Sequence, residues 1–241
     1  SERVRKLSLQ PVLVSILIGE NDGSERYVSL KQKFAERIGA KMIVQRFSKE
    51  TSEQQIIDKI RDLNEDDAVD GIMIQLPVPS VHDKDKLIEE ISSLKDVDGM
   101  KDDSSFISPV ALSVLEVIKN SGTKSTRVGI IGANGFIGSK VAGTLSGYDI
   151  QKFDKGDKLD DIMGCDIVIS TSGEPDLISS GLVKQGSLCI DIGAPRAEFS
   201  KNVYEKAGII TPVPGGIGPM TIAYLMHNLV ESAVAKANKV C

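Results

Sequence analysis

Several residue types are scarce in this chain of 241 residues, which contains no tryptophan, three cysteines and two histidines. Cys165, Cys189 and Cys241 are odd in number and lack the paired spacing of a zinc site. We therefore expect reduced thiols and a cytoplasmic protein. Since His82 and His227 are the only histidines, a histidine-based zinc site is disfavoured, and we predict no metal site.

An excess of positive charge is also lacking, because the net charge is −5. Lys and Arg are spread along the chain, so we predict neither a nucleic-acid partner nor binding to an anionic membrane. No apolar run reaches the roughly 18 residues that indicate a membrane-spanning helix. Residues 1–20 also lack the apolar core of a signal peptide. The contents of 41% hydrophobic and 26% charged residues are typical of a soluble globular protein.

Apolar runs alternate with amphipathic ones along most of the chain, which predicts alternating strands and helices. The predicted strands are residues 11–19, 41–47, 69–77, 127–131, 148–153, 165–171, 186–193 and 208–213. The predicted helices are residues 25–39, 52–66 with Ser52 as its cap, 84–92, about a dozen residues from Pro109, 136–145 and 219–238. Such alternation implies parallel sheets covered by helices.

The polar segment 101–106 interrupts this alternation, so we divide the chain near residue 110. We predict an α/β fold with two lobes. Residues 1–110 form an N-terminal α/β lobe, and residues 111–218 form a Rossmann-like, doubly wound parallel sheet. Because ligands favour the space between lobes, we expect the active site in the interlobe cleft.

In the predicted helix 25–39, one lysine falls among the apolar residues. At about 100° per residue, Lys31 lies roughly 40° from Tyr27, inside the arc of apolar side chains. That arc comprises Tyr27, Leu30, Phe34, Ala35 and Ile38. Apolar surroundings lower the pKa of an ammonium, which would let Lys31 act as a general acid/base near neutral pH. Alternatively, its stem lies on apolar surface while its head reaches water.

Three glycines, Gly132, Gly135 and Gly138, stand between the predicted strand 127–131 and the helix 136–145. Glycine permits a tight turn and lets the backbone approach a pyrophosphate, and the helix N-terminus offers N–H groups to its charge. This context predicts a dinucleotide-binding turn. The alternative is a glycine-rich turn that binds nothing.

Asp154 follows the next predicted strand, where an acid binds the adenosine ribose hydroxyls and disfavours a 2′-phosphate. Lys152 and Lys155 flank it and could instead attract that phosphate. The stretch favours NAD over NADP, and a plain surface turn is the alternative.

Four blocks of sequence resemble the methylenetetrahydrofolate dehydrogenase/cyclohydrolase family of one-carbon metabolism. In the family's order, they are GSERYVSLKQKFAERIGA, GIMIQLPVPSVHD, LKDVDGM and TPVPGGIGPMTIAYLMHN. The resemblance runs from about Pro11 to the C-terminus and is weaker through Gly156–Asp161 and Ala194–Ser200. It implies tetrahydrofolate derivatives as substrates, a folate site in the N-terminal lobe and a homodimer. It also implies that the C-terminal helix, residues 219–241, returns to the N-terminal lobe.

The family pattern implies roles for individual residues. By motif match, Lys31 is the catalytic lysine, Gln75 supports it, Asp98 hydrogen-bonds the pterin and Tyr27 stacks on the pterin. The residues that would line the wall between folate and nicotinamide are Pro214, Gly215, Gly216 and Ile217. Those expected around the nucleotide are Gly132, Asn134, Gly135, Phe136, Ile137, Gly138, Asp154, Lys155, Gly173 and Thr211. For Asp96 we favour a solvated loop acid.

The chain departs from the family at two places. Members commonly carry Gly-Arg-Ser at the nucleotide turn, where the arginine helps to hold the phosphate of NADP. This chain has Gly132-Ala133-Asn134, so the cofactor is NAD(P), with Ala133 and Asp154 favouring NAD although the family favours NADP. The Pro-Cys-Thr-Pro element of the family is reduced to ISPVA.

The resemblance implies a bifunctional enzyme that oxidises 5,10-methylenetetrahydrofolate with NAD(P)⁺ and hydrolyses the methenyl product to 10-formyltetrahydrofolate. One alternative is a dehydrogenase with weak cyclohydrolase activity. A second is a short-chain reductase or epimerase, suggested by GANGFIG together with Tyr27 and Lys31 but opposed by the order of these motifs. A third is a non-catalytic remnant that binds folate or nucleotide.

Overall fold

The computed structural model describes residues 9–19 and 22–240, and these form two compact units. Unit 1 contains the described residues up to Ser108 together with those from Leu225 onward. Unit 2 is Pro109–Tyr224. The last helix, α7 (Ile217–Val240), therefore begins in unit 2 and ends in unit 1.

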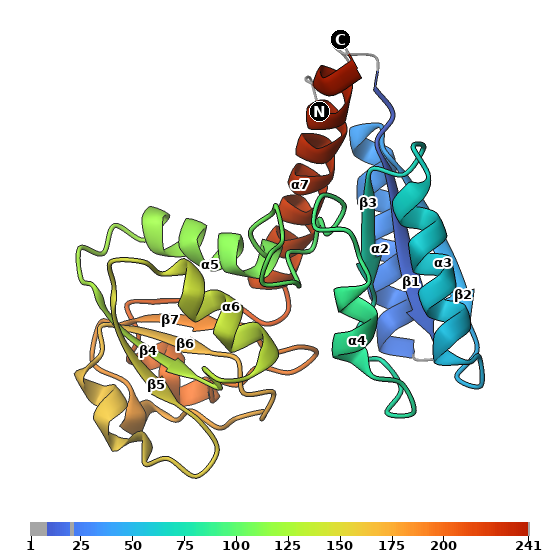
Figure 1. Ribbon diagram of the computed structural model, residues 1–241. Helices are drawn as coiled ribbons and strands as arrows, with labels where there is room; N and C mark the ends of the chain where they lie inside the picture. Colours follow the sequence, from blue (N-terminus) through green and yellow to red (C-terminus); the bar gives the residue numbers. More distant parts are fainter. Residues whose placement is uncertain (1–8, 20–21, 241) are drawn as a thin grey trace. The chain divides into compact units, whose positions relative to one another are not determined.

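Unit 1 is built on a parallel three-stranded sheet with the order β2-β1-β3 (Figure 1). Its strands are β1 (Val12–Ile18), β2 (Lys41–Phe47) and β3 (Gly71–Ile74), and its helices before α7 are α2 (Asp22–Ile38), α3 (Glu53–Glu65) and α4 (Lys84–Glu89). The structure confirms that these strands and helices alternate. β3 is shorter than the predicted strand 69–77 at both ends, and Pro77 has no N–H with which to carry the ladder further.

The sequence signal at the start of α3 is confirmed in atomic detail. The hydroxyl of Ser52 accepts the N–H of Gln55 at 3.3 Å, and the Gln55 side chain accepts the N–H of Ser52 at 3.2 Å. This reciprocal pair satisfies two backbone donors that the first helical turn leaves unpaired.

The core of unit 1 joins the sheet and α2 to the last helix. The buried side chains are Leu13, Val28, Ala35, Ala40, Met42, Met73, Val97, Leu225, Met226 and Leu229. Polar contacts also fix this end of α7. The Asn228 amide donates to the carbonyls of Val97 and Ile107 at 2.9 and 3.0 Å, and the Ser232 hydroxyl donates to that of Asp70 at 2.6 Å.

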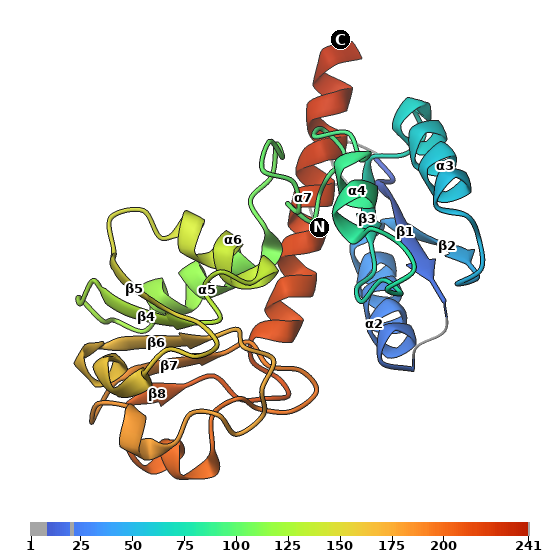
Figure 2. The ribbon, with the colours of Figure 1, turned by 60° about the horizontal axis from the view of Figure 1, so that its bottom comes forward.

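Unit 2 carries a parallel five-stranded sheet with the order β5-β4-β6-β7-β8 (Figure 2). The strands are β4 (Arg127–Ile131), β5 (Asp149–Phe153), β6 (Ile167–Ser170), β7 (Leu188–Asp191) and β8 (Ile209–Ile210). The α-helices before α7 are α5 (Pro109–Asn120) and α6 (Phe136–Thr144), and the 3₁₀ helices are η1 (Leu159–Gly164), η2 (Ser180–Leu182) and η3 (Lys201–Glu205).

Two hydrophobic clusters cover the two faces of this sheet, as a doubly wound fold requires. One includes Val114 of α5 and Val141 of α6, and the other includes Ile162 of η1 and Val203 of η3. The chain steps from β4 to β5 in one direction and from β4 through β6 to β8 in the other. The strand order therefore reverses between β4 and β6, which is where open α/β sheets bind ligands, beyond the carboxyl ends of the strands.

Within residues 9–19 and 22–240, no helix has the length and apolar character needed to cross a membrane. The same residues contain no group of three or more His, Cys, Asp or Glu side chains that could hold a metal ion.

Candidate functional site

Lys31 lies in the middle of α2 with only 8% of its surface exposed. Its Nζ donates a hydrogen bond to Gln75 Oε1 at 2.9 Å and lies 3.7 Å from Met73 Sδ. Burial lowers the pKa of the Lys31 ammonium, and the charge of Asp98 opposes that shift. The alternative in which this head group reaches water is therefore wrong.

Lys31 lies at one edge of the fully buried stripe of α2, because Val28 and Ala35 both lie in the same direction from it around the helix. Val28 and Ala35 are fully buried and lie about 60° and 40° from Lys31 around the helix. Leu30, which the periodicity placed on the apolar side, is 47% exposed. That prediction was wrong because Leu30 lies about 100° from Lys31 in the opposite direction, away from Val28 and Ala35. Tyr27 is half-buried, one turn before Lys31.

Gln75 comes directly after β3, at the carboxyl end of the sheet. Its N–H donates to the Ile16 carbonyl at 2.8 Å, which extends the ladder, and its side-chain Nε2 donates to the Leu76 carbonyl at 2.8 Å. With the amide nitrogen held by Leu76, the amide oxygen faces Lys31. Gln75 thus fixes the position of the lysine Nζ.

Asp98 is the third polar group of this cluster. Burial raises its pKa to about 6, the Lys31 ammonium lowers it and the Asp96 carboxylate raises it further. Gly99, with φ of +61°, follows it, and a Cβ there would lie 2.5 Å from the Ser108 N. The chain after Asp98 therefore needs glycine, which accounts for the Asp-Gly pair of the KDVDG block.

Asp96 corrects a prediction, because it is completely buried rather than solvated. Its Oδ2 accepts the Lys101 N–H at 2.9 Å, while its Oδ1 has no hydrogen-bond partner among the described residues. Sequence reasoning missed this acid and its effect on Asp98. The available signal was that Asp96 and Asp98 stand two residues apart, with the apolar Val97 between them.

The glycine turn of unit 2 has no room for side chains at two of its three glycines. Gly132 has φ of +76°, and a Cβ on it would lie 2.7 Å from the Thr171 carbonyl oxygen. A Cβ on Gly138 would lie 2.0 Å from the Gly132 oxygen. The N-cap of α6 is Gly135, which has no side chain to cap the helix. The first turn of α6, with Phe136 and Ile137, can thus receive a phosphate.

Asp154 lies beside this turn. Its two carboxylate oxygens are 3.1 and 3.3 Å from the Asn134 N, whose N–H they accept. Ala133 is fully buried, whereas Lys152 and Lys155 are exposed. The group held against the turn is therefore a carboxylate and not a cation.

The structure places the other predicted site residues of unit 2 in different environments, and some of them are already buried or hydrogen-bonded. The Thr211 hydroxyl accepts the Asp191 N–H at 2.8 Å, so it joins β7 to the chain after β8. Ile217 is buried in the core of unit 2. Pro214 and Gly215 are exposed, and Gly216 is half-buried. Gly173 has φ of +75° and lies in the exposed loop after β6.

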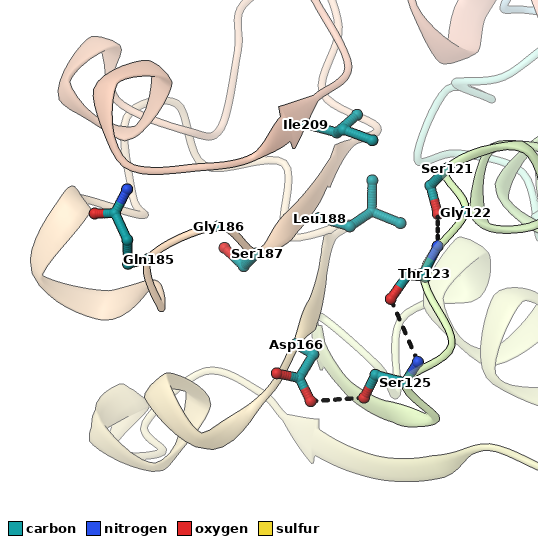
Figure 3. A pocket seen from close by; sticks show the side chains of 10 residues that line it. All are labelled: Ser121, Gly122, Thr123, Ser125, Asp166, Gln185, Gly186, Ser187, Leu188 and Ile209. Carbon is teal, nitrogen blue, oxygen red and sulfur yellow. Dashed lines mark hydrogen bonds between the residues drawn. The ribbon is translucent and has the colours of Figure 1, made fainter.

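A cavity of about 370 Å³ lies at the amino ends of the strands of the unit 2 sheet, at the end opposite to the glycine turn (Figure 3). Asp166, which precedes β6, accepts the Ser125 hydroxyl at 2.6 Å there and pairs with Lys184. Leu188 at the start of β7 and Ile209 at the start of β8 also line it. Because α/β sheets bind ligands at the carboxyl ends of their strands, this cavity is separate from the predicted nucleotide site.

Two models of one protein family match this chain, one over most of unit 1 and one over unit 2. The family model for the "Tetrahydrofolate dehydrogenase/cyclohydrolase, catalytic domain" matches residues 1–98, and that for the "NAD(P)-binding domain" of the same family matches residues 108–237. The bifunctional protein FolD of Campylobacter hominis is 34% identical, over 92% of this chain and 87% of the relative. That of Bacillus cytotoxicus is 32% identical, over 99% and 91%.

Solved structures are similar over nearly the whole chain. The FolD methylenetetrahydrofolate dehydrogenase/cyclohydrolase of Campylobacter jejuni has a TM-score of 0.91 at 32% identity, covering 97% of this chain and 92% of that one. The Trypanosoma brucei enzyme, solved with NADP and an inhibitor, has a TM-score of 0.89 at 26% identity, covering 97% and 90%. The NAD-dependent dehydrogenase of Saccharomyces cerevisiae, 20% identical with a TM-score of 0.76 over 96% and 90%, shares the fold. The chain therefore belongs to the tetrahydrofolate dehydrogenase/cyclohydrolase family.

Proposed function

We propose that this protein oxidises 5,10-methylenetetrahydrofolate to 5,10-methenyltetrahydrofolate with NAD(P)⁺ and hydrolyses the product to 10-formyltetrahydrofolate. The observation that carries the proposal is the buried Lys31, whose Nζ is held by Gln75 at 2.9 Å within the electrostatic reach of Asp98. Membership of the family supports it and leaves the short-chain reductase alternative without support.

In the hydrolysis, Lys31 is the group that moves protons. Because burial lowers its pKa, its neutral form is accessible, and it accepts a proton from the water that attacks the methenyl carbon. It returns that proton to the departing ring nitrogen as the carbon–nitrogen bond breaks, while the hydroxyl of the water adduct loses its own proton to solvent and becomes the formyl oxygen. Gln75 keeps Nζ in place, so the lysine needs no reorganisation before each transfer.

On the folate side, we assign binding to Tyr27 and Asp98. Tyr27 is on the same side of α2 as Lys31 and offers a ring on which a pterin can stack. Asp98, with a pKa of about 6, can either accept or donate a hydrogen bond to the pterin near neutral pH. In unit 2, we assign substrate binding by the family's motif to Pro214, Gly215 and the backbone at Gly216.

On the nucleotide side, the turn from Gly132 to Gly138 and the N-terminus of α6 would hold the pyrophosphate. The cofactor, when bound, supplies a ring that accepts a hydride. We propose NAD over NADP, because the Asp154 carboxylate sits 3.1 Å from the Asn134 N and would repel a 2′-phosphate. Ala133 supplies no charge to attract one.

Two broader features belong to the same proposal. We propose a homodimer, since β2 is an edge strand that pairs only with β1 among the described residues and exposes Ile43. We also propose a cytoplasmic location, in keeping with the free, buried thiols of Cys165 and Cys189.

One assay tests the reaction. Purified protein is mixed with 5,10-methylenetetrahydrofolate and either NAD⁺ or NADP⁺, and absorbance follows both the reduced nucleotide and the methenyl product. We expect reduced nucleotide with NAD⁺ and little accumulation of methenyl. Accumulation of methenyl would favour the dehydrogenase with weak cyclohydrolase activity, whereas nucleotide binding without turnover would favour the non-catalytic remnant.

A further inference from the structure

A buried carboxylate holds the loop that follows β6. Glu198 is 2% exposed and accepts the N–H groups of Ser172 and Gly173 at 2.8 and 2.9 Å. It also accepts the hydroxyl of Ser172 at 2.6 Å and that of Ser170. These donors offset the cost of taking the charge out of water, and together they fix the path of the loop backbone.

Glu198 is itself held in place by a second buried acid. Asp191, at the end of β7, accepts the N–H groups of Gly193, Glu198 and Phe199 at 2.9, 2.9 and 3.1 Å. The Ile178 N–H donates to the Glu198 carbonyl at 3.0 Å. A Cβ on Gly193 would lie 2.8 Å from Glu198 Cγ, so glycine makes room for this side chain. The carboxylate is therefore positioned by the fold.

The loop that Glu198 holds lies at the point where the strand order reverses. Ser172 and Gly173 follow β6, and the glycine turn follows β4, the neighbouring strand. The two segments touch, because the Thr171 hydroxyl donates to the Gly132 carbonyl at 3.0 Å. In open α/β sheets, the two sides of such a crevice are the walls of the ligand site.

We propose that Glu198 is a positioning residue for the dinucleotide, which acts by holding the Ser172–Gly173 wall in its binding shape. The inference rests on the proposed function, since it takes the nucleotide to bind beyond β4 and β6. Glu198 lies within Ala194–Ser200, where the resemblance to the family's motifs is weaker, so motif matching did not single it out.

The test replaces Glu198 by glutamine. The amide keeps the shape but has one acceptor oxygen, and its NH₂ would face N–H and O–H donors. We expect E198Q to bind NAD⁺ at least about tenfold more weakly by calorimetry, which corresponds to one poorly made polar contact. Amide hydrogen exchange over residues 170–174 should accelerate. Hydrolysis of methenyltetrahydrofolate, which consumes no nucleotide, should stay within about twofold of the wild type.

The matched control is E205Q, the same chemical change at an exposed position in η3, which should alter none of these measurements. S172A removes one of the hydroxyls that donate to Glu198, together with the acceptor of the Glu174 N–H, and should weaken NAD⁺ binding to a smaller extent. If E198Q does not fold, S172A decides the matter. Unchanged NAD⁺ affinity in folded E198Q, or in S172A when E198Q is unfolded, would overturn the role of Glu198. Failure of the wild type to bind NAD⁺ or NADP⁺ would instead count against the proposed function.

Discussion

At the scale of single residues, the proposed chemistry depends on a lysine removed from water. Lys31 lies beside Val28 and Ala35 in the buried stripe of α2, in the place of a third apolar side chain. A buried ammonium is costly unless it is hydrogen-bonded, and Gln75 supplies that bond. In the proposed function, the helix therefore gives up core packing to hold a proton-transfer group.

Replacing Lys31 by glutamine should separate the two activities. Without a titratable amine, we expect cyclohydrolase activity to fall by about 100-fold or more, since general acid/base catalysis contributes that much. Hydride transfer should persist in part, because it needs positioning rather than a proton at Lys31. Both rates are measured by absorbance, with K33Q, an exposed lysine on the same helix, as the control. Equal loss of both activities with folate binding intact would contradict this division.

Asp98 should leave a signature in the pH dependence of stability. Its pKa is about 6 in the folded protein, above the ordinary 3.8, so between these values the folded state binds the extra proton. The free energy of unfolding should therefore decrease as pH rises from about 4 to about 6, by roughly 3 kcal/mol in total, and then level off. D98N should lack this decrease in urea denaturation at several pH values. Parallel curves for the two proteins would show that Asp98 titrates normally.

At the scale of elements, the nucleotide turn requires glycine at some positions and only tolerates it at others. Gly138 lies against the Gly132 carbonyl, whereas a Cβ on Gly143, one and a half turns further along α6, would meet nothing within 4 Å. Glycine inside a helix costs stability because it loses more backbone entropy than alanine. Gly138 must therefore be retained for close packing, whereas alanine can replace Gly143 and should make the helix more stable.

The same substitution at these two glycines should have opposite effects. G138A should destabilise unit 2 by about 2 kcal/mol or more and abolish nucleotide binding, because the added methyl overlaps a backbone oxygen. G143A should stabilise the protein by about 0.5–1 kcal/mol, the usual helix-propensity gain. Chemical denaturation measures both. A stable G138A protein that binds NAD⁺ normally would mean that the turn can open without cost.

At the scale of the whole molecule, α7 is the element that both compact units share. Residues up to Tyr224 belong to unit 2, and those from Leu225 onward complete the core of unit 1. Asn228 holds the backbone on either side of the Asp98 loop through hydrogen bonds to the carbonyls of Val97 and Ile107. The folate side of the proposed site thus depends on residues more than 100 positions away in sequence.

Assembly of two chains is testable through β2. The outer edge of this strand carries backbone groups that can pair with another chain, and Ile43 on it is 38% exposed. We expect light scattering to give a dimer for the wild type and a larger fraction of monomer for I43K, since an edge lysine opposes strand pairing. V81K, which changes an exposed apolar residue in a loop, should remain dimeric. A monomeric wild type would refute the proposed homodimer.

The sequence by itself determined the order of elements, the cap at Ser52, the glycine turn and the lysine in the apolar arc. These depend on periodicity and on backbone demands within a few residues, which local sequence carries. Only the tertiary structure decided that Leu30 is exposed, that Asp96 is buried and that Glu198 holds the Gly173 loop. Those outcomes are set by contacts between segments distant in the chain, and no local pattern specifies which backbone donors will surround a carboxylate.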